Sequence, residues 1–158
     1  MKVSLIAIGK TKEPYLKSGI EIYEKRLPHY LKFSYIETPD VKNKGAKYDP
    51  ERVKKEELKL VSKYLEDVDH LVLLDEGGKQ YTSQQFASWW EQRQIQSPKH
   101  LVFLIGGAYG FHEDLKAQCR EKIALSKMTF SHQMVRLFAI EQIYRAQSIL
   151  RGEPYHHE

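Results

Sequence analysis

His132 and Arg136 stand four residues apart at the start of a segment with helical character, so on a helix they share one face. Ser131 precedes them and is a typical N-cap residue. The positive end of a helix dipole disfavours a protonated imidazole. A neutral histidine can accept a proton while an arginine stabilises negative charge on a substrate. The plainer interpretation is a capping histidine beside a solvated arginine.

The glycine loop Gly106-Gly-Ala-Tyr-Gly110 is a second candidate site, because it follows the apolar run Leu101–Ile105. Glycine lets the backbone approach a ligand closely. Gly77 and Gly78 follow the preceding apolar run, which would give two neighbouring strand ends permissive backbone. Such an arrangement suits a flat, adenine-like ligand held by main-chain groups, although a purely structural turn explains the loop equally well. The spacing is not the dinucleotide fingerprint G-x-G-x-x-G.

The segment from Arg151 to Glu158 reads as a polar tail that carries Tyr155, His156 and His157. A frayed terminus is the default for such a segment. Two adjacent histidines without a third ligand at suitable spacing do not predict zinc. An aromatic ring beside basic and imidazole groups is, however, typical of a site that stacks on a splayed RNA base. In the helical segment that precedes this tail, Glu141 and Arg145 are four residues apart and are predicted to form an ion pair.

Short apolar runs alternate with charged amphipathic segments, which predicts alternating strands and helices. The predicted strands are Val3–Ile8, Phe33–Ile36, Leu71–Leu74, Leu101–Ile105 and Ile123–Leu125. The predicted helices are Pro14–Leu27, Glu51–Glu66, one capped by Thr82, and the longest, His132–Leu150, with a lysine-rich loop over Thr38–Pro50. This pattern predicts an α/β fold with a mostly parallel sheet flanked by helices, whose ligands lie at the carboxyl ends of the strands.

The composition limits the number of domains, the cellular compartment and the kinds of partner that we expect. The 158 residues correspond to about one domain, residues 1–158, and a net charge of +4 is only a mild basic bias. The single cysteine, Cys119, excludes an intrachain disulfide and a multi-cysteine metal site, which favours a reducing compartment. No signal-peptide or membrane-spanning pattern is present. We therefore expect a cytoplasmic protein with no membrane partner and no metal.

Motifs along essentially the whole chain resemble the RlmH (YbeA-like) family of SPOUT-class ribosomal RNA methyltransferases. They are Val3–Lys10, Tyr23–Arg26, Leu74-Asp-x-x-Gly78-Lys79, Ile105-Gly-Gly107 with Gly110, Leu125–Phe130, His132–Arg136, Glu141–Arg145 and Arg151–His156. One departure is Ser131, where family members usually carry proline; it alters the cap of the following helix.

The resemblance implies a SPOUT fold with a C-terminal trefoil knot, a homodimer, and the cofactor S-adenosyl-L-methionine bound in the knot. It implies N3-methylation of a pseudouridine in helix 69 of 23S ribosomal RNA on the assembled 70S ribosome. By motif matching, the residues expected to contact the cofactor are Leu74, Gly106, Leu125, Ser126, Lys127, Met128, Thr129 and Phe130.

The chemistry of that reaction selects the catalytic candidates. The N3 of a uracil ring becomes a good nucleophile only as its proton leaves, so a base is wanted. His132 or His156 is the candidate base, Arg136 the candidate for charge stabilisation, and Tyr155 a candidate for positioning the target. Water or the RNA itself could also accept the proton.

Other functions remain open at this point. A SPOUT methyltransferase acting on transfer RNA would use the same cofactor motifs, although no added RNA-binding domain is evident. A non-catalytic ribosome-binding factor with the same fold would bind ribosomes without methyl transfer. A dinucleotide-binding oxidoreductase is disfavoured, because the glycine loop comes late and no ribose-binding acid follows it.

Overall fold

The computed structural model describes residues 1–41 and 49–157, so the predicted loop over Thr38–Pro50 lies mostly outside the described residues. Five parallel strands form one sheet in the order β2-β1-β4-β3-β5. Their bounds are β1 Lys2–Ala7, β2 Lys32–Glu37, β3 His70–Gln80, β4 His100–Ile105 and β5 Glu121–Ala124. The predicted α/β class with a parallel sheet is confirmed. The trefoil knot stays a prediction, because strand order alone does not define how the chain threads.

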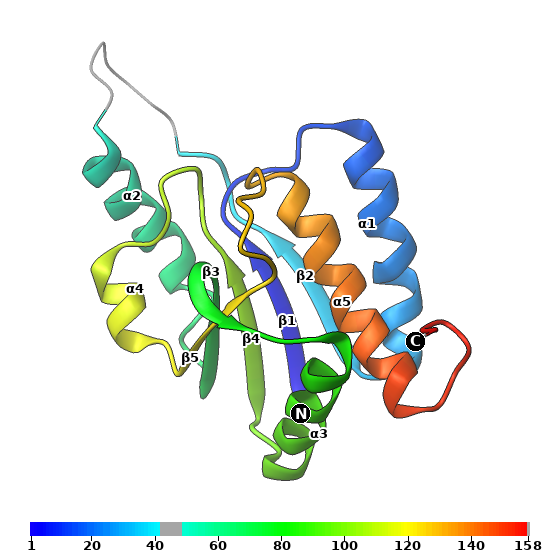
Figure 1. The fold of residues 1–158 in the computed structure, drawn as a ribbon. Coiled ribbons are helices and arrows are strands. Elements are labelled where there is room, and N and C mark those ends of the chain that lie inside the picture. The colour runs from blue at the N-terminus through cyan, green and yellow to red at the C-terminus, as the bar shows by residue number, and fades with distance from the viewer. Residues whose placement is uncertain (42–48, 158) are drawn as a thin grey trace.

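Helices cover both faces of this sheet (Figure 1). The helices α1 (Pro14–Arg26), α3 (Ser83–Gln96) and α5 (Met134–Leu150) pack together on one face, whereas α2 (Pro50–Ser62) and α4 (Glu113–Gln118) lie on the other. A short 3-10 turn, Leu27–His29, follows α1.

Alternation along β1 explains how one strand serves both layers. Leu5 and Ala7 join the core under α1, α3 and α5, whereas Ile6 and Ile8 join the core under α2 and α4. Side chains of a strand point to opposite faces in turn, so a strand buried on both sides is apolar throughout. The continuous apolar runs of the sequence therefore mark the centre of the sheet.

The end of β3 differs from the prediction. The strand was expected to end at Leu74, with Gly77 and Gly78 beyond it, but β3 continues to Gln80 and pairs with β5 on both sides of an irregularity between Leu74 and Lys79. A Cβ placed on Gly78 would lie 2.6 Å from the backbone nitrogen of Ile123. Gly78 is thus needed for close strand contact and does not form a ligand-binding turn.

The start of α5 also differs. The helix begins at Met134, two residues later than predicted, and Gln133 at its N-cap makes no side-chain cap bond. Ser131 still contributes, because its hydroxyl accepts a hydrogen bond from the Met134 amide at 3.1 Å. His132 therefore lies in the turn before the helix and not on its face. The six-residue α4 was not predicted; His112 caps it by accepting from the Asp114 amide.

Candidate active site

A cavity of about 670 Å³, the large cavity, opens at the carboxyl ends of β4 and β5, beside Leu74, Asp75 and Glu76, where the pairing of β3 with β4 ends. Ligands in parallel α/β sheets bind at this edge, and the volume lies within the usual range for small-molecule sites. Its wall consists mainly of the glycine loop, the middle of β3 and most of the chain from Leu125 to His132. Segments far apart in the sequence thus meet at one edge of the sheet.

The glycine loop presents backbone to the large cavity. Gly110 has φ +76°, a conformation that side chains disfavour, and its amide donates to the Gly107 carbonyl at 3.2 Å. A Cβ on Gly106 would lie 3.2 Å from the ring of Phe111. At the three glycine positions, this part of the wall therefore carries no side chain between the backbone and a ligand.

Another part of the wall comes from the segment between Leu125 and Phe130, which side-chain bonds hold in place. The Ser126 hydroxyl accepts from the Met128 amide at 2.9 Å, and the Thr129 hydroxyl donates to the Glu76 carboxylate at 3.0 Å. Of the residues expected to contact a cofactor, those on the cavity wall are Leu74, Gly106, Leu125, Ser126, Met128, Thr129 and Phe130, whereas Lys127 is not on it.

A cavity of about 280 Å³, the small cavity, adjoins the large cavity. The two share wall residues Gly107, Ala108, Tyr109 and His132. A larger share of the lining residues is charged in the small cavity than in the large cavity. These charged residues are Lys12, Asp40, Glu57 and Arg136. His132 therefore stands at the junction of the two spaces.

The surroundings of His132 favour its neutral form. Burial lowers the pKa of its imidazole, the cations of Arg136 and Lys12 lower this pKa further, and Asp40 opposes them. The expected direction of the pKa shift is found, but burial is its principal cause and not the helix dipole.

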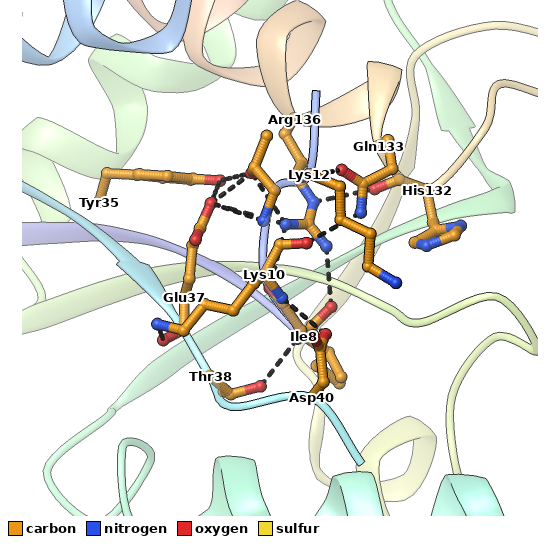
Figure 2. A network of polar contacts seen from close by, with 12 residues as sticks. Ile8, Lys10, Lys12, Tyr35, Glu37, Thr38, Asp40, His132, Gln133 and Arg136 are labelled. Carbon is orange, nitrogen blue, oxygen red and sulfur yellow. Dashed lines mark hydrogen bonds and ion pairs between the residues drawn. The ribbon is translucent and has the colours of Figure 1, made fainter. Parts of the chain in front are cut away.

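Arg136 is completely buried, which the sequence did not predict. Its guanidinium donates to the carbonyls of Ile8 and Gly9, to the Thr11 hydroxyl and to the carbonyl of His132, at 2.9–3.0 Å (Figure 2). These bonds tie the turn before α5 to the chain that leaves β1. The guanidinium N–H groups therefore bond to oxygens of the protein itself. This geometry is that of a residue that positions its neighbours.

Tyr155 and His156 lie at the other end of α5 from His132. The Tyr155 hydroxyl donates to Glu141 at 3.1 Å, and His156 Nδ1 lies 3.3 Å from Arg145 Nη1. The ion pair between Glu141 and Arg145 is confirmed. A 17-residue helix is about 25 Å long, so the structure does not bring Tyr155 and His156 to the His132 of the same chain.

Glu57 also lines the small cavity and was not among the candidate residues predicted from the sequence. Glu57 lies four residues after Val53 and four before Val61, on the stripe of α2 that faces the sheet. A carboxylate on a core-facing stripe is a signal in itself, because charged side chains are rarely buried without a partner. That position would have identified it.

The described residues contain no group of three or more His, Cys, Asp or Glu side chains arranged to hold a metal ion. Among these residues, no helix is long and apolar enough to cross a membrane.

Comparisons with known proteins agree with this architecture. A family model described as "Predicted SPOUT methyltransferase" matches residues 1–156. A protein of Cytophaga hutchinsonii is 52% identical over 99% of this chain and 100% of its own length. One of Parabacteroides distasonis is 51% identical over 100% of both chains. The chain therefore belongs to the SPOUT methyltransferase family. Both relatives are called "Ribosomal RNA large subunit methyltransferase H", which confirms the resemblance to RlmH proteins.

Proposed function

We propose that this protein uses S-adenosyl-L-methionine to methylate N3 of a pseudouridine in helix 69 of 23S ribosomal RNA on the assembled ribosome. The observation that carries the proposal is the backbone-walled large cavity beside a smaller charged cavity, in a chain that is about half identical to large-subunit ribosomal RNA methyltransferases over its full length. An enzyme with this substrate would work in the cytoplasm, where ribosomes are.

The large cavity suits the proposed cofactor. Its glycine loop offers main-chain donors and acceptors to an adenine ring, with the apolar side chains of Leu74 and Leu125 beside it. Asp75 and Glu76 line the same space and supply negative charge for a ligand that carries cationic groups. When bound, S-adenosylmethionine supplies a methyl group on a positively charged sulfur.

The remaining residues orient the target. His132, whose surroundings favour its neutral form, lies at the junction of the cavities and can hydrogen-bond the pyrimidine where it meets the methyl donor. Arg136 fixes the backbone of His132 through its bond to the His132 carbonyl. Alignment of donor and acceptor supplies much of the rate in an in-line displacement. In this proposal Arg136 acts through His132, in place of the direct charge stabilisation expected from the sequence.

A homodimer would complete the site. Tyr155 and His156 can act beside His132 only if they come from a second copy, since α5 separates them within one chain. Exposed apolar side chains suit such an interface: Met128, Phe130 and Phe138 are 76%, 36% and 39% exposed, and Phe130 packs on Phe138 with ring centroids 4.9 Å apart. A dimer also doubles the modest +4 charge that one chain presents to RNA.

The substrate is tested with radiolabelled methyl donor and four acceptors: ribosomes lacking the modification, separated large subunits, protein-free 23S RNA and transfer RNA. We expect labelling of assembled ribosomes above all others. Labelling of transfer RNA alone would replace the proposal with the transfer RNA methyltransferase. Tight ribosome binding without label on any acceptor would replace it with a non-catalytic binding factor.

A further inference from the structure

Glu57 is a buried acid with an unused oxygen. The side chain is only 8% exposed, and Oε2 has no hydrogen-bond partner among the described residues. Leaving a carboxylate buried without partners is costly, and an apolar residue at this core-facing position of α2 would avoid that cost. Within the described residues, no hydrogen bond to Oε2 explains why an acid stands here.

The Glu57 carboxylate points at the junction of the two cavities. A Cβ built on Gly107 would lie 2.1 Å from Glu57 Oε1, so the carboxylate rests directly against this glycine. Gly107 lines both cavities, and Glu57 lines the small one. Any larger residue at position 107 would collide with the acid. The absence of a side chain there is what lets the carboxylate reach this point.

The small cavity has the size and polarity for one flat heterocycle. Its volume of about 280 Å³ lies just below the range of about 300–1,000 Å³ that is typical of drug-sized ligands. Lys12 and Asp40 line it and offer a donor and an acceptor. Enzymes that modify a base commonly extrude it from the helix into such a pocket.

We propose that the small cavity holds the target pyrimidine and that Glu57 accepts its ring N–H proton. This role rests on the methyltransferase function proposed above. The Glu57 carboxylate takes the proton from the ring nitrogen, and the lone pair of that nitrogen forms the bond to the methyl carbon. The bond between this carbon and sulfur breaks, and its electron pair stays on sulfur, which becomes a neutral thioether. The protonated Glu57 then releases its proton to solvent.

The electrostatics of the small cavity favour Glu57 over His132 as the base. The charged and titratable groups that line the cavity with Glu57 are Lys12, Asp40, Tyr109, His132 and Arg136. Burial raises the pKa of Glu57 to about 7, whereas burial and cations lower the pKa of His132. Proton acceptors work best with a pKa near the working pH. His132 is then left to orient the ring.

The test compares Glu57→Gln with Glu56→Gln, a control on the same helix whose carboxylate pairs with Lys59 at the surface. Single-turnover methyl transfer to ribosomes is followed across neutral pH, and S-adenosylmethionine affinity is measured separately by calorimetry. In Glu57→Gln we expect a rate loss of about 100-fold or more with cofactor affinity unchanged. The wild-type inflection near pH 7 should disappear in this variant, while Glu56→Gln keeps both rate and inflection.

Two further variants complete the test. Glu57→Asp keeps a carboxylate on a shorter side chain and should recover part of the rate. His132→Asn should lower the rate but keep the inflection. Full activity in Glu57→Gln, a loss that follows weakened cofactor binding, or an inflection lost only in His132→Asn would each overturn the role of Glu57. A wild-type protein without methyl transfer would instead overturn the proposed function, and this role with it.

Discussion

Arg136 and Glu57 are both buried ionisable residues that line the small cavity, but they differ in how their polar atoms are hydrogen-bonded. Arg136 satisfies its guanidinium with protein oxygens, three of which belong to the chain that leaves β1. Glu57 has one oxygen without a hydrogen-bond partner in the part of the chain that the structure describes. The first arrangement stabilises the fold, whereas the second sacrifices stability at a place where chemistry can use it.

Replacing Arg136 should therefore destabilise the protein even when the positive charge is kept. Lysine cannot reproduce a planar fork that bonds to several oxygens at once. We expect Arg136→Lys to lower the free energy of unfolding by about 2–4 kcal/mol, measured by urea titration. The control Arg52→Lys, exposed on α2, should change it by less than about 0.5 kcal/mol. Equal stability of the two variants would contradict the structural role of Arg136.

Replacing Glu57 by glutamine should instead raise the free energy of unfolding. The pKa of Glu57 is raised from 4.5 unfolded to about 7 folded, so the folded state holds the proton more tightly between these values. Stability from this group is therefore present below about pH 4.5 and is lost as pH rises through 7. We expect Glu57→Gln to be more stable than wild type by about 1–3 kcal/mol above pH 7 and to lack this pH dependence. Lower stability at pH 8 would show that the carboxylate has a stabilising partner.

At the scale of elements, β3 and β5 meet closely because Gly78 has no side chain. Gly78→Ala would place a Cβ 2.6 Å from β5 backbone, whereas at Gly77 the nearest contact is the flexible Asp75 carboxylate at 3.1 Å. We expect Gly78→Ala to lower the free energy of unfolding by about 1–3 kcal/mol, and Gly77→Ala to cost clearly less. Thermal unfolding of the two variants checks the difference. Similar melting temperatures would contradict the close contact.

Much of this architecture could be predicted from the sequence. All five strands were predicted, and most clearly the central strands β1 and β4, which are buried on both faces and are largely apolar runs. The edge strands β2 and β5 gave shorter apolar signals. The end of β3 was missed because a glycine pair reads locally as a turn, and only its pairing with β5 makes it a strand. The short α4 was missed because six residues show too little periodicity.

The site was predictable in part. The motifs identified both of these parts of the large cavity's wall, the glycine loop and the segment from Leu125 to Phe130, because the resemblance covers them residue by residue. Burial of Arg136 could not be foreseen, since an arginine beside a helix start usually faces solvent. The separation of Tyr155 from His132 became visible only with the length and direction of α5.

At the scale of the whole molecule, the proposed dimer makes a prediction about mixed species. If each site combines His132 of one copy with the tail of the other, a dimer of His132→Ala and Tyr155→Ala subunits contains one intact site. Random exchange of two inactive variants should then restore about a quarter of wild-type methyl transfer. Each variant alone serves as the control. No recovery, with subunit exchange verified, would place His132 and Tyr155 in the same chain's site.

The proposed enzyme methylates one ring nitrogen of large-subunit ribosomal RNA, and this reaction can be tested directly. In the most direct measurement, the protein is incubated with ribosomes lacking the modification and with labelled S-adenosylmethionine. The label is then mapped by mass spectrometry of RNA fragments. We predict one labelled nucleotide, a pseudouridine of helix 69 methylated at N3. Label at another nucleotide, or none on ribosomes that the protein binds, would contradict the account.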